Sequence, residues 1–329
     1  MTDLQGQLER VCRRHFGDDA SVDSVSRLSA GASSQSWLIT VRAASLEGPQ
    51  KIVLQTSAGG EHYPLALDKQ TQALVQRAAF VQGVPTPEVL FILDAEDSLG
   101  EGFASRWHAG ETLGRRIVTD PHYATARSCL IAQCAEALAS IHRAELAALP
   151  PLPQRSASAG LRELTLSYRR YGNGVPIFEL ALRWLEDHLP EDCPPALVHG
   201  DFRVGNFLVD ETGLRQVLDW EMAHLGDPLE DLGWMMVNAW RFGVIDRPVG
   251  GIGQLDEWCR EYSRASGIKA DENVVRYWQM FGTVQWGVMC LWFAKQFIDG
   301  SVREIERLAI GRRVSEVQLD LMDLIRGRE

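Results

Sequence analysis

The segment Leu197–Asp210, LVHGDFRVGNFLVD, places an acid and an amide five residues apart in a loop between two strand-like apolar runs. The chain continues through a Thr212–Gly213 turn into a second apolar run that ends at Asp219. A short turn between two β-type runs predicts a hairpin. Because Asn206 lies six residues before Thr212 and Asp219 six residues after Gly213, we expect the hairpin to set Asn206 and Asp219 side by side at its open end.

The polar side chains around this hairpin have complementary chemistry. An amide oxygen and a carboxylate are hard-oxygen ligands that suit Mg²⁺ when water and phosphate supply its other ligands. Asp201, one turn of the loop away, is then placed to accept a proton from a hydroxyl bound near that metal. The alternative interpretation is a solvated acidic loop.

The sequence motif HGDFRVGN, followed by LDWEMAHLGDPLEDLGW, resembles the aminoglycoside phosphotransferase (APH) and choline kinase-like family. Within that family it is most similar to the branch fused to, or encoded beside, acyl-CoA dehydrogenases. The resemblance implies an α+β, bilobal, protein-kinase-like fold, with a small β-rich N-terminal lobe that has one main helix and a larger, mostly helical C-terminal lobe. It implies ATP- and Mg²⁺-dependent phosphorylation of a small-molecule alcohol. Asp201 would be the catalytic residue, and Asn206 and Asp219 would bind the metal.

Other polar residues of the segment receive structural roles from the resemblance. His199 is expected to position the loop backbone, and Asp227 and Asp231 are expected to brace it. For Glu221, binding a second metal and facing solvent both stay open. A metal-dependent hydrolase built on His199 and Asp201 is disfavoured, because no second histidine stands at ligand spacing.

Two further segments are assigned to nucleotide binding. Gly31, Ser33 and Ser34 stand in a small-residue turn that resembles the family's phosphate-covering loop, where backbone N–H groups approach phosphate. A plain hairpin turn is the alternative, and no Walker motif occurs in the chain. The stretch 103–110 occupies the place of the family's interlobe hinge, where backbone groups from Ser105 to His108 would meet adenine.

The pattern departs from the family at one position. The basic residue expected at the end of the third strand, which contacts the ATP phosphates, is Gln55, and its helical Glu partner is replaced by Gln72. Two amides can hydrogen-bond each other, but the phosphate loses a fixed cation, a loss of about 10²- to 10³-fold in rate. Lys69 and Arg42 are better candidates than Lys51 to replace that charge.

Apolar periodicity outlines two lobes, residues 1–105 and 106–329. The resemblance implies nucleotide binding for the first lobe and catalysis and substrate binding for the second. In the first lobe we expect helices at 4–16 and 67–81 and strands at 36–42, 51–55 and 89–93. In the second we expect helices at 123–148, at 177–189 and from about 255 to the end, with a Pro/Ser/Ala loop at 149–160.

Composition limits the partners. A net charge of −11 argues against a nucleic-acid surface, and six scattered cysteines without CxxC spacing favour reduced thiols in a cytoplasmic protein. The polar first residues do not resemble a signal peptide. The most apolar stretch, 277–294, contains too many polar residues for a membrane span, and a buried helix fits it better. The oligomeric state is not predicted.

The acceptor is less constrained. The acidic charge fits an aminoglycoside polycation, whereas a helical lobe rich in tryptophan, together with the acyl-CoA-dehydrogenase-associated branch, favours a hydroxyacyl-CoA-like metabolite. Most of these tryptophans are expected to be core residues, with one or two lining a pocket. Arg241 and Arg247 would either meet anionic groups or be solvated at the surface, with solvation favoured. A kinase-like protein that binds a nucleotide or metabolite without catalysis is the rival, motivated by Gln55 and Gln72.

Overall fold

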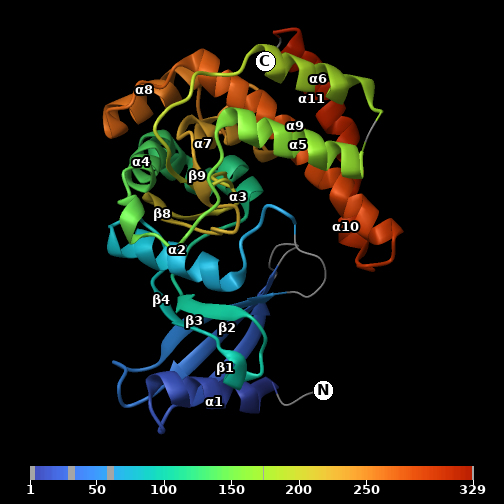
Figure 1. The fold of residues 1–329 in the computed structure, drawn as a ribbon. Helices are drawn as coiled ribbons and strands as arrows, with labels where there is room; N and C mark the ends of the chain where they lie inside the picture. Colours follow the sequence, from blue (N-terminus) through green and yellow to red (C-terminus); the bar gives the residue numbers. More distant parts are fainter. Residues whose placement is uncertain (1–3, 29–33, 58–62, 173, 328–329) are drawn as a thin grey trace. The chain divides into compact units, whose positions relative to one another are not determined.

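The chain folds into two compact units, described here from a computed structural model that covers residues 4–28, 34–57, 63–172 and 174–327 (Figure 1). Unit 1 consists of residues 1–82 and 86–109, and unit 2 of residues 83–85 and 110–329. Unit 1 is a small antiparallel sheet with two helices, and unit 2 is mostly helical. The α+β, bilobal, kinase-like architecture is thereby confirmed. The roles assigned to the two lobes stay a prediction.

Unit 1 is built on one five-stranded antiparallel sheet in the order β1-β2-β3-β5-β4. One face packs against α1 through a buried apolar cluster that includes Leu8, Ile39 and Leu54. The other face carries Val89 and Phe103, which pack against Ala73 of α2. The elements are α1 (Leu4–Phe16), β1 (Ser21–Leu28), β2 (Ser34–Arg42), β3 (Gln50–Ser57), α2 (Lys69–Val81), β4 (Val89–Ile92), a 3₁₀ turn η1 (Ala95–Asp97) and β5 (Gly102–Arg106).

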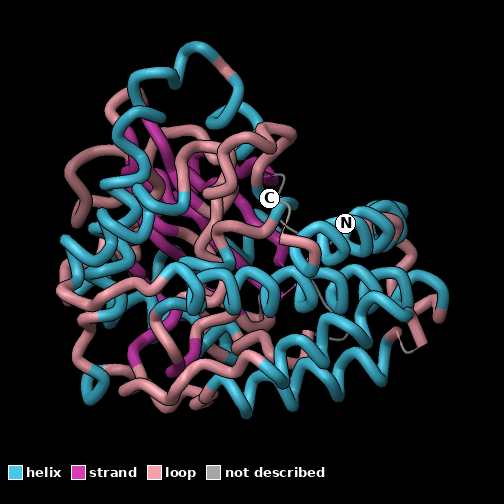
Figure 2. Tube along the Cα trace, turned by 90° about the horizontal axis from the view of Figure 1, so that it is seen from above, coloured by secondary structure: helices cyan, strands magenta, loops and turns pink. Residues whose placement is uncertain are grey.

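Unit 2 is organised around α9, which contacts α5, α6, α7, α8, α10 and α11. Several of these helices run side by side in Figure 2. The helices are α3 (Gly114–Thr119), α4 (Ala124–His142), α5 (Ala157–Tyr171), α6 (Pro176–Asp187), α7 (Leu229–Trp234), α8 (Leu255–Ser266), α9 (Glu272–Ile298), α10 (Ile305–Gly311) and α11 (Val314–Ile325), with 3₁₀ turns η2 (Pro121–Tyr123), η3 (Leu146–Ala148) and η4 (Asn238–Trp240).

Two short two-stranded sheets in unit 2 carry the segment 197–210. β6 (Ala196–Val198) pairs with β9 (His224–Gly226), and β7 (Phe207–Asp210) pairs with β8 (Gly213–Val217). The loop that contains Asp201 and Asn206 therefore runs from β6 to β7, and Asp219 follows β8. Most apolar residues of these strands are buried, which fixes the loop on a rigid base.

Most elements agree with the predicted pattern, but the helix expected at 123–148 ends at His142 as α4, and a separate 3₁₀ turn covers Leu146–Ala148. Two further differences have local reasons. The expected loop at 149–160 ends early, because Ser156 caps the N-terminus of α5 through a bond from the Ala159 N–H to its side chain. The helix expected from 67 begins at Lys69, because Asp68 is its N-cap. Within the described chain, no helix is long and apolar enough to cross a membrane, and the apolar stretch 277–294 lies within the mostly buried helix α9.

Candidate active site

The loop after β6 takes its sharp turn at Gly200. Its φ of +78° lies in the left-handed region, and a Cβ built there would stand 2.3 Å from the carbonyl oxygen of Met222. Only glycine combines that backbone angle with such a close approach. The turn therefore projects Asp201, the next residue, away from the strand.

The hairpin β7–β8 forms, but its register differs from the prediction by one residue. Phe207 pairs with Val217, and the Leu218 N–H donates to the Asn206 carbonyl at 2.8 Å. Asn206 is thus opposite Leu218 instead of Asp219. The turn falls at residues 211–212 instead of Thr212–Gly213, which alone would set Asn206 opposite Val217. An irregularity of register in the middle of the hairpin offsets one of these two residues.

Asp219 lies just beyond the hairpin in an unusual backbone conformation. Its φ is +69°, a value that residues other than glycine seldom adopt. Such strain persists only where the surrounding structure holds it, and it is frequent at functional sites. The left-handed turn redirects the chain directly after the ladder. The metal role predicted for Asp219 stays a prediction.

The carboxylate of Asp201 is held by three side-chain donors. Oδ1 accepts from Arg203 Nε at 2.8 Å and from Trp234 Nε1 at 2.7 Å, and Oδ2 accepts from Asn206 Nδ2 at 2.5 Å. An ionised carboxylate has about four lone-pair sites. The three donors therefore fix its orientation and leave one acceptor site, on Oδ2.

The amide of Asn206 is oriented by two acceptors. Its Nδ2 donates to the Asp201 backbone carbonyl at 3.0 Å as well as to the carboxylate. Both partners only accept, so the nitrogen must face them and the oxygen Oδ1 must face the other way. Asn206 therefore presents an oxygen on the side opposite Asp201, the chemistry that a Mg²⁺ ligand requires.

Asp231 braces the backbone of the loop from α7. Its carboxylate accepts from the N–H groups of His199 at 2.8 Å and Gly200 at 2.9 Å, and from His142 Nε2 at 3.1 Å. Burial alone would raise the pKa of Asp231, but the hydrogen bond and charge interaction with His142 and the backbone donor hold the pKa below its usual value. Asp227 plays a similar part just before α7, where its carboxylate accepts from the Leu229 N–H and from Trp278 Nε1.

His199 is fully buried beneath the loop. Burial lowers the pKa of its imidazole, although the carboxylates of Asp231, Asp201 and Asp219 oppose that shift. Nδ1 accepts the Asp201 N–H at 3.2 Å, which places the ring proton on Nε2. A neutral imidazole accepts the backbone N–H of Asp201, and the positioning role expected for His199 stays a prediction.

Three tryptophans lead from Asp201 to a cavity in unit 2. Trp234 donates to Asp201, its ring centroid lies 5.4 Å from that of Trp240, and Trp240 lies 4.9 Å from Trp286. Arg203, which also holds Asp201, lies over the Trp240 ring at 4.4 Å. The sequence did not point to Trp234 or Arg203 as partners of Asp201, since neither has a distinctive local spacing.

This cavity, of about 490 Å³, is lined by Trp286 and by charged side chains of both signs. Arg115 and Arg313 supply positive charge, and Glu316 and Asp320 supply negative charge. The six tryptophans expected in the helical lobe are all buried, and Trp286 lines this cavity. The expectation that most of these tryptophans are core residues is confirmed.

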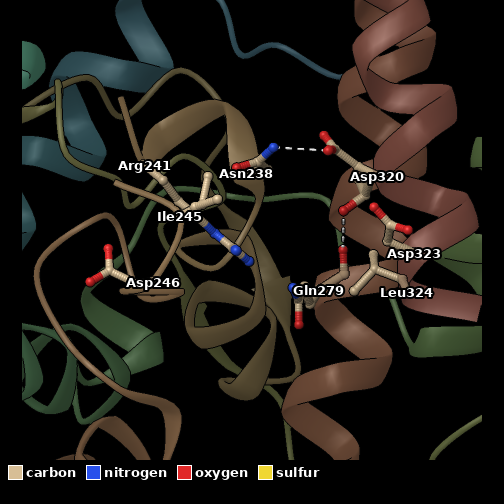
Figure 3. Close-up of a pocket in the computed structure, with 9 residues that line it drawn as sticks. Asn238, Arg241, Ile245, Asp246, Gln279, Asp320, Asp323 and Leu324 are labelled. Atoms are coloured by element: carbon tan, nitrogen blue, oxygen red, sulfur yellow. Dashed lines mark hydrogen bonds between the residues drawn. The ribbon is translucent and has the colours of Figure 1, made fainter. Parts of the chain in front are cut away.

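A second cavity of about 330 Å³ shares Asn238, Ile245 and Asp320 with the first. Figure 3 shows Asn238 donating to Asp320, a bond of 2.8 Å. Burial raises the pKa of Asp320, against the opposing hydrogen bond from Asn238 and the charge of Arg241. Gln279 lines the same cavity, and its buried Oε1 has no hydrogen-bond partner within the described chain.

The expectation that Arg241 is solvated is wrong. Its side chain is 6% exposed, donates to the Met236 carbonyl and lines the smaller cavity, because η4 and the turn after it fold the guanidinium inward. Arg247, by contrast, is exposed.

The residues assigned to the nucleotide lie in unit 1, with different outcomes. Gly31 and Ser33 fall outside the described residues. Ser34 begins β2, and Gln55 lies in β3. Ser105 lies inside β5, where it pairs with Val53 of β3 and with Val89 of β4, and the adenine contact expected from its backbone stays a prediction. His108 lies in the exposed loop that follows.

A search of the described residues for clusters of three or more His, Cys, Asp or Glu side chains that could hold a metal finds none. Asn206 and Asp219 are a pair of different composition, one amide and one carboxylate. Such a pair suits a metal whose remaining ligands are phosphate and water.

Known proteins are similar to this chain in sequence or in structure. A model of the phosphotransferase enzyme family (APH) matches residues 24–268. Acyl-CoA dehydrogenase family member 11 of Gallus gallus is 29% identical over 245 residues, 70% of this chain but only 30% of that protein. The chain thus spans about a third of the length of that relative.

Solved structures show the same fold at lower identity. A candidate aminoglycoside phosphotransferase from Ralstonia eutropha has a TM-score of 0.71 at 19% identity, with 98% of each chain covered. A ternary complex of aminoglycoside phosphotransferase APH(4)-Ia with ADP and hygromycin B has a TM-score of 0.62 at 18% identity, covering 97% of this chain and 98% of that one. With the family model matching most of its length, the chain belongs to the APH phosphotransferase enzyme family.

Proposed function

We propose that the protein transfers the γ-phosphate of ATP to a hydroxyl of a small molecule, with Asp201 as the general base. The observation that supports this most is the hydrogen bonding of Asp201: three donors hold its carboxylate and leave one acceptor site on Oδ2. A hydroxyl bound there would give its proton to Oδ2 as it attacks phosphorus. Arg203 and Trp234 keep the carboxylate oriented for that step.

Asn206 and Asp219 would hold Mg²⁺ in this proposal. Their donor atoms fit the ion, because the Asn206 oxygen faces away from Asp201 and Asp219 follows the hairpin that starts at Asn206. When bound, Mg²⁺ neutralises charge on the phosphates. In this scheme Asn206 has two tasks, since its nitrogen orients the base while its oxygen faces the metal.

For the acceptor, we favour a hydroxyacyl-CoA-like metabolite. The cavity of about 490 Å³ falls in the size range of small-molecule sites, and the tryptophan series connects it to Asp201. Trp286 offers an apolar surface for an acyl chain, and Arg115 and Arg313 offer charge for anionic groups. The relative named acyl-CoA dehydrogenase family member 11 supports the same class.

A polycationic aminoglycoside is the second candidate acceptor. The smaller cavity is lined by three carboxyl groups, those of Asp246, Asp320 and Asp323, and by the unpartnered Oε1 of Gln279. These acceptors suit a ligand rich in amines and hydroxyls. The APH(4)-Ia complex with hygromycin B gives a chemical precedent.

The test measures transfer of the γ-phosphate from ATP to an added acceptor. Purified protein is mixed with Mg²⁺ and ATP labelled at the γ-phosphate, together with 3-hydroxyacyl-CoAs, hygromycin B or buffer, and labelled product is separated. We expect label on a hydroxyacyl-CoA. Label on hygromycin B alone would replace the favoured acceptor with the second candidate.

A thermal shift with ATP and Mg²⁺ separates the enzyme from a protein that only binds. Stabilisation by the nucleotide without transfer to any acceptor would favour the silent binder, for which Gln55 and Gln72 are the motive. The proposal would be overturned if ATP and Mg²⁺ did not stabilise the protein and no acceptor received phosphate.

A further inference from the structure

The face of the unit 1 sheet that carries Gln55 has a row of small polar side chains. Gln55 pairs with Ser36 across β2 and β3, and Ser34 pairs with Ser57 two residues further along. Directly paired residues point to the same face of a sheet, and alternate residues share it. Ser57 Oγ is buried and has no hydrogen-bond partner within the described chain.

Lys69, the first residue of α2, reaches this face and is only 3% exposed. Its Nζ donates to Ser34 Oγ at 2.6 Å and to Gln72 Oε1 at 2.9 Å. Both partners are neutral. No acidic side chain of the described residues forms an ion pair with Lys69, although other cations of unit 1, such as Arg14 and Arg42, do have acidic partners.

These contacts also decide what Gln72 does. Its Oε1 accepts from Lys69, and its Nε2 donates to the Leu67 carbonyl at 2.9 Å. The amide pair with Gln55 that the sequence allows is therefore not formed among the described contacts. Gln72 instead supports the ammonium of Lys69 as a neutral acceptor.

The position of Lys69 is unfavourable in the absence of an anion. A buried lysine is rare unless it is paired with an acid, because desolvation of the charge is opposed only by hydrogen bonds. The N-terminus of a helix also carries partial positive charge, which repels a cation in the first turn. A negative ligand beside Nζ would remove both penalties.

We propose that Lys69 contacts the phosphates of the nucleotide and supplies the positive charge that Gln55 lacks. This assignment rests on the proposed function. It selects Lys69 over Arg42 and Lys51, the other two cations that the sequence offered for the contact with phosphate. Arg42 is committed to Asp23 through two hydrogen bonds and is 60% exposed in its side chain. Lys51 lies over the ring of Trp107 at 4.6 Å.

The geometry brings Lys69 within reach of the position that Gln55 occupies. Ser34, which accepts a hydrogen bond from Lys69, is the diagonal neighbour of Gln55 on the adjacent strand. A lysine at position 55 and one at position 69 would thus place positive charge over the same part of the sheet. In this proposal the cation that contacts the phosphates stands at the start of α2 instead of on β3.

The experiment compares nucleotide affinities of the full chain and of Lys69→Met. Titrations with ATP and Mg²⁺ and with adenosine separate the phosphate contacts from the base and sugar contacts. We expect Lys69→Met to weaken ATP binding by about 10- to 100-fold, the range for a lost hydrogen bond to a charged group, and to leave adenosine binding unchanged. Lys51→Met is the matched control, and its ATP affinity should stay that of the wild type.

A second variant tests the location of the charge. In Lys69→Met, the added change Gln55→Lys should restore part of the ATP affinity, since it returns a cation to the same face. Without nucleotide, Lys69→Met should be at least as heat-stable as the wild type, because it removes an uncompensated buried charge. Should Lys69→Met not fold, Lys69→Arg, which displaces the charge, takes its place in the same comparison of ATP with adenosine.

Equal ATP affinity in the wild type and in Lys69→Met would overturn the assignment while leaving the proposed function intact. So would an equal loss for ATP and adenosine, or a lower melting temperature without any change of ATP affinity. If the wild type itself bound no nucleotide, the proposed function would fail and the role of Lys69 with it.

Discussion

The loop that carries Asp201 and the sheet face that carries Gln55 manage charge in opposite ways. Around the loop, Asp201 and, from α7, Asp231 each accept several hydrogen bonds. On the sheet face, Lys69 has two neutral acceptors and no acidic partner among the described residues. A carboxylate held by several donors is oriented before a ligand arrives, whereas a buried cation without an acidic partner gains one only when an anion binds. Under the proposed function, the first region would serve catalysis and the second recognition of the nucleotide.

The largest expected effect comes from removing the proposed base, the carboxylate of Asp201, in the loop between β6 and β7. Asp201→Asn should lower phosphoryl transfer by about 10²- to 10⁴-fold, the usual contribution of a general base. The fold should persist, because the amide is nearly the same size as the carboxylate. Steady-state rates and circular dichroism measure the two effects.

The matched control for that change is Asp210→Asn in the β7–β8 hairpin. Asp210 accepts from the Thr212 N–H, so the substitution changes an acid of the same segment outside the Asp201 cluster. Its rate should stay within about threefold of the wild type. Near-normal turnover by Asp201→Asn would remove Asp201 from the mechanism.

The metal assignment is tested by the dependence of the rate on Mg²⁺. Asp219→Asn removes a charged ligand and should lower the rate at a fixed Mg²⁺ concentration by about 10²- to 10³-fold, comparable to the loss of one electrostatic contact. Raising Mg²⁺ should recover part of the loss. Asn206→Ala should also raise the Mg²⁺ requirement, and it should additionally impair the base, because Asn206 Nδ2 holds Asp201.

Glu221→Gln serves as the comparison for Asp219→Asn. If Glu221 faces solvent, its substitution should change the Mg²⁺ requirement little, and if it binds a second metal the requirement should rise. An unchanged Mg²⁺ profile in Asp219→Asn would contradict its role as a ligand.

The hydrogen bonds by which Asp231 braces the loop should contribute to the free energy of unfolding. Asp231→Ala leaves the buried N–H groups of His199 and Gly200, and the ring of His142, without their acceptor. Breaking such a buried cluster costs about 3–5 kcal/mol of unfolding free energy. Urea denaturation followed by tryptophan fluorescence measures it.

Asp320→Asn is the contrast for Asp231→Ala. Burial raises the pKa of Asp320, so its neutral form is the better tolerated one, whereas the pKa of Asp231 is lowered. Asp320→Asn should change the free energy of unfolding by much less than the loss of Asp231. Equal losses for the two variants would show that the difference between these acids does not govern stability.

The same two regions show what can be predicted from sequence. The loop was predictable because Asp201, Asn206 and Asp219 lie close together in the chain, so spacing and a turn signal suffice. The register of Asn206 was not predictable, since the turn falls one residue earlier than Thr212–Gly213 and an irregularity within the hairpin offsets only half of the resulting two-residue shift. The contact between Lys69 and Ser34 joins residues 35 apart, which no local pattern encodes. Likewise, α5 was missed because its first turn is rich in Ser and Ala, and only the cap at Ser156 marks the start.

The smallest expected effect is a pH dependence of stability that separates two buried histidines. Burial lowers the pKa of His199, so below about pH 6.5 the unfolded chain binds a proton that the folded chain does not. The folded state therefore loses stability as the pH falls through that range, by at most about 1.4 kcal/mol per pH unit. Denaturation midpoints at pH 7.5, 6.5 and 5.5 measure the slope, which should be smaller in His199→Asn.

His224 provides the opposite sign. Burial would lower the pKa of this imidazole, but the charge and hydrogen bond of Glu230 raise it above its usual value, so its contribution to stability is lost as the pH rises. Glu230→Gln should remove that contribution and make the protein more sensitive to acid than the wild type. If His199→Asn and Glu230→Gln changed the slope in the same direction, the two histidines could not have oppositely shifted pKa values, and the neutral state of His199 beneath the catalytic loop would lose its support.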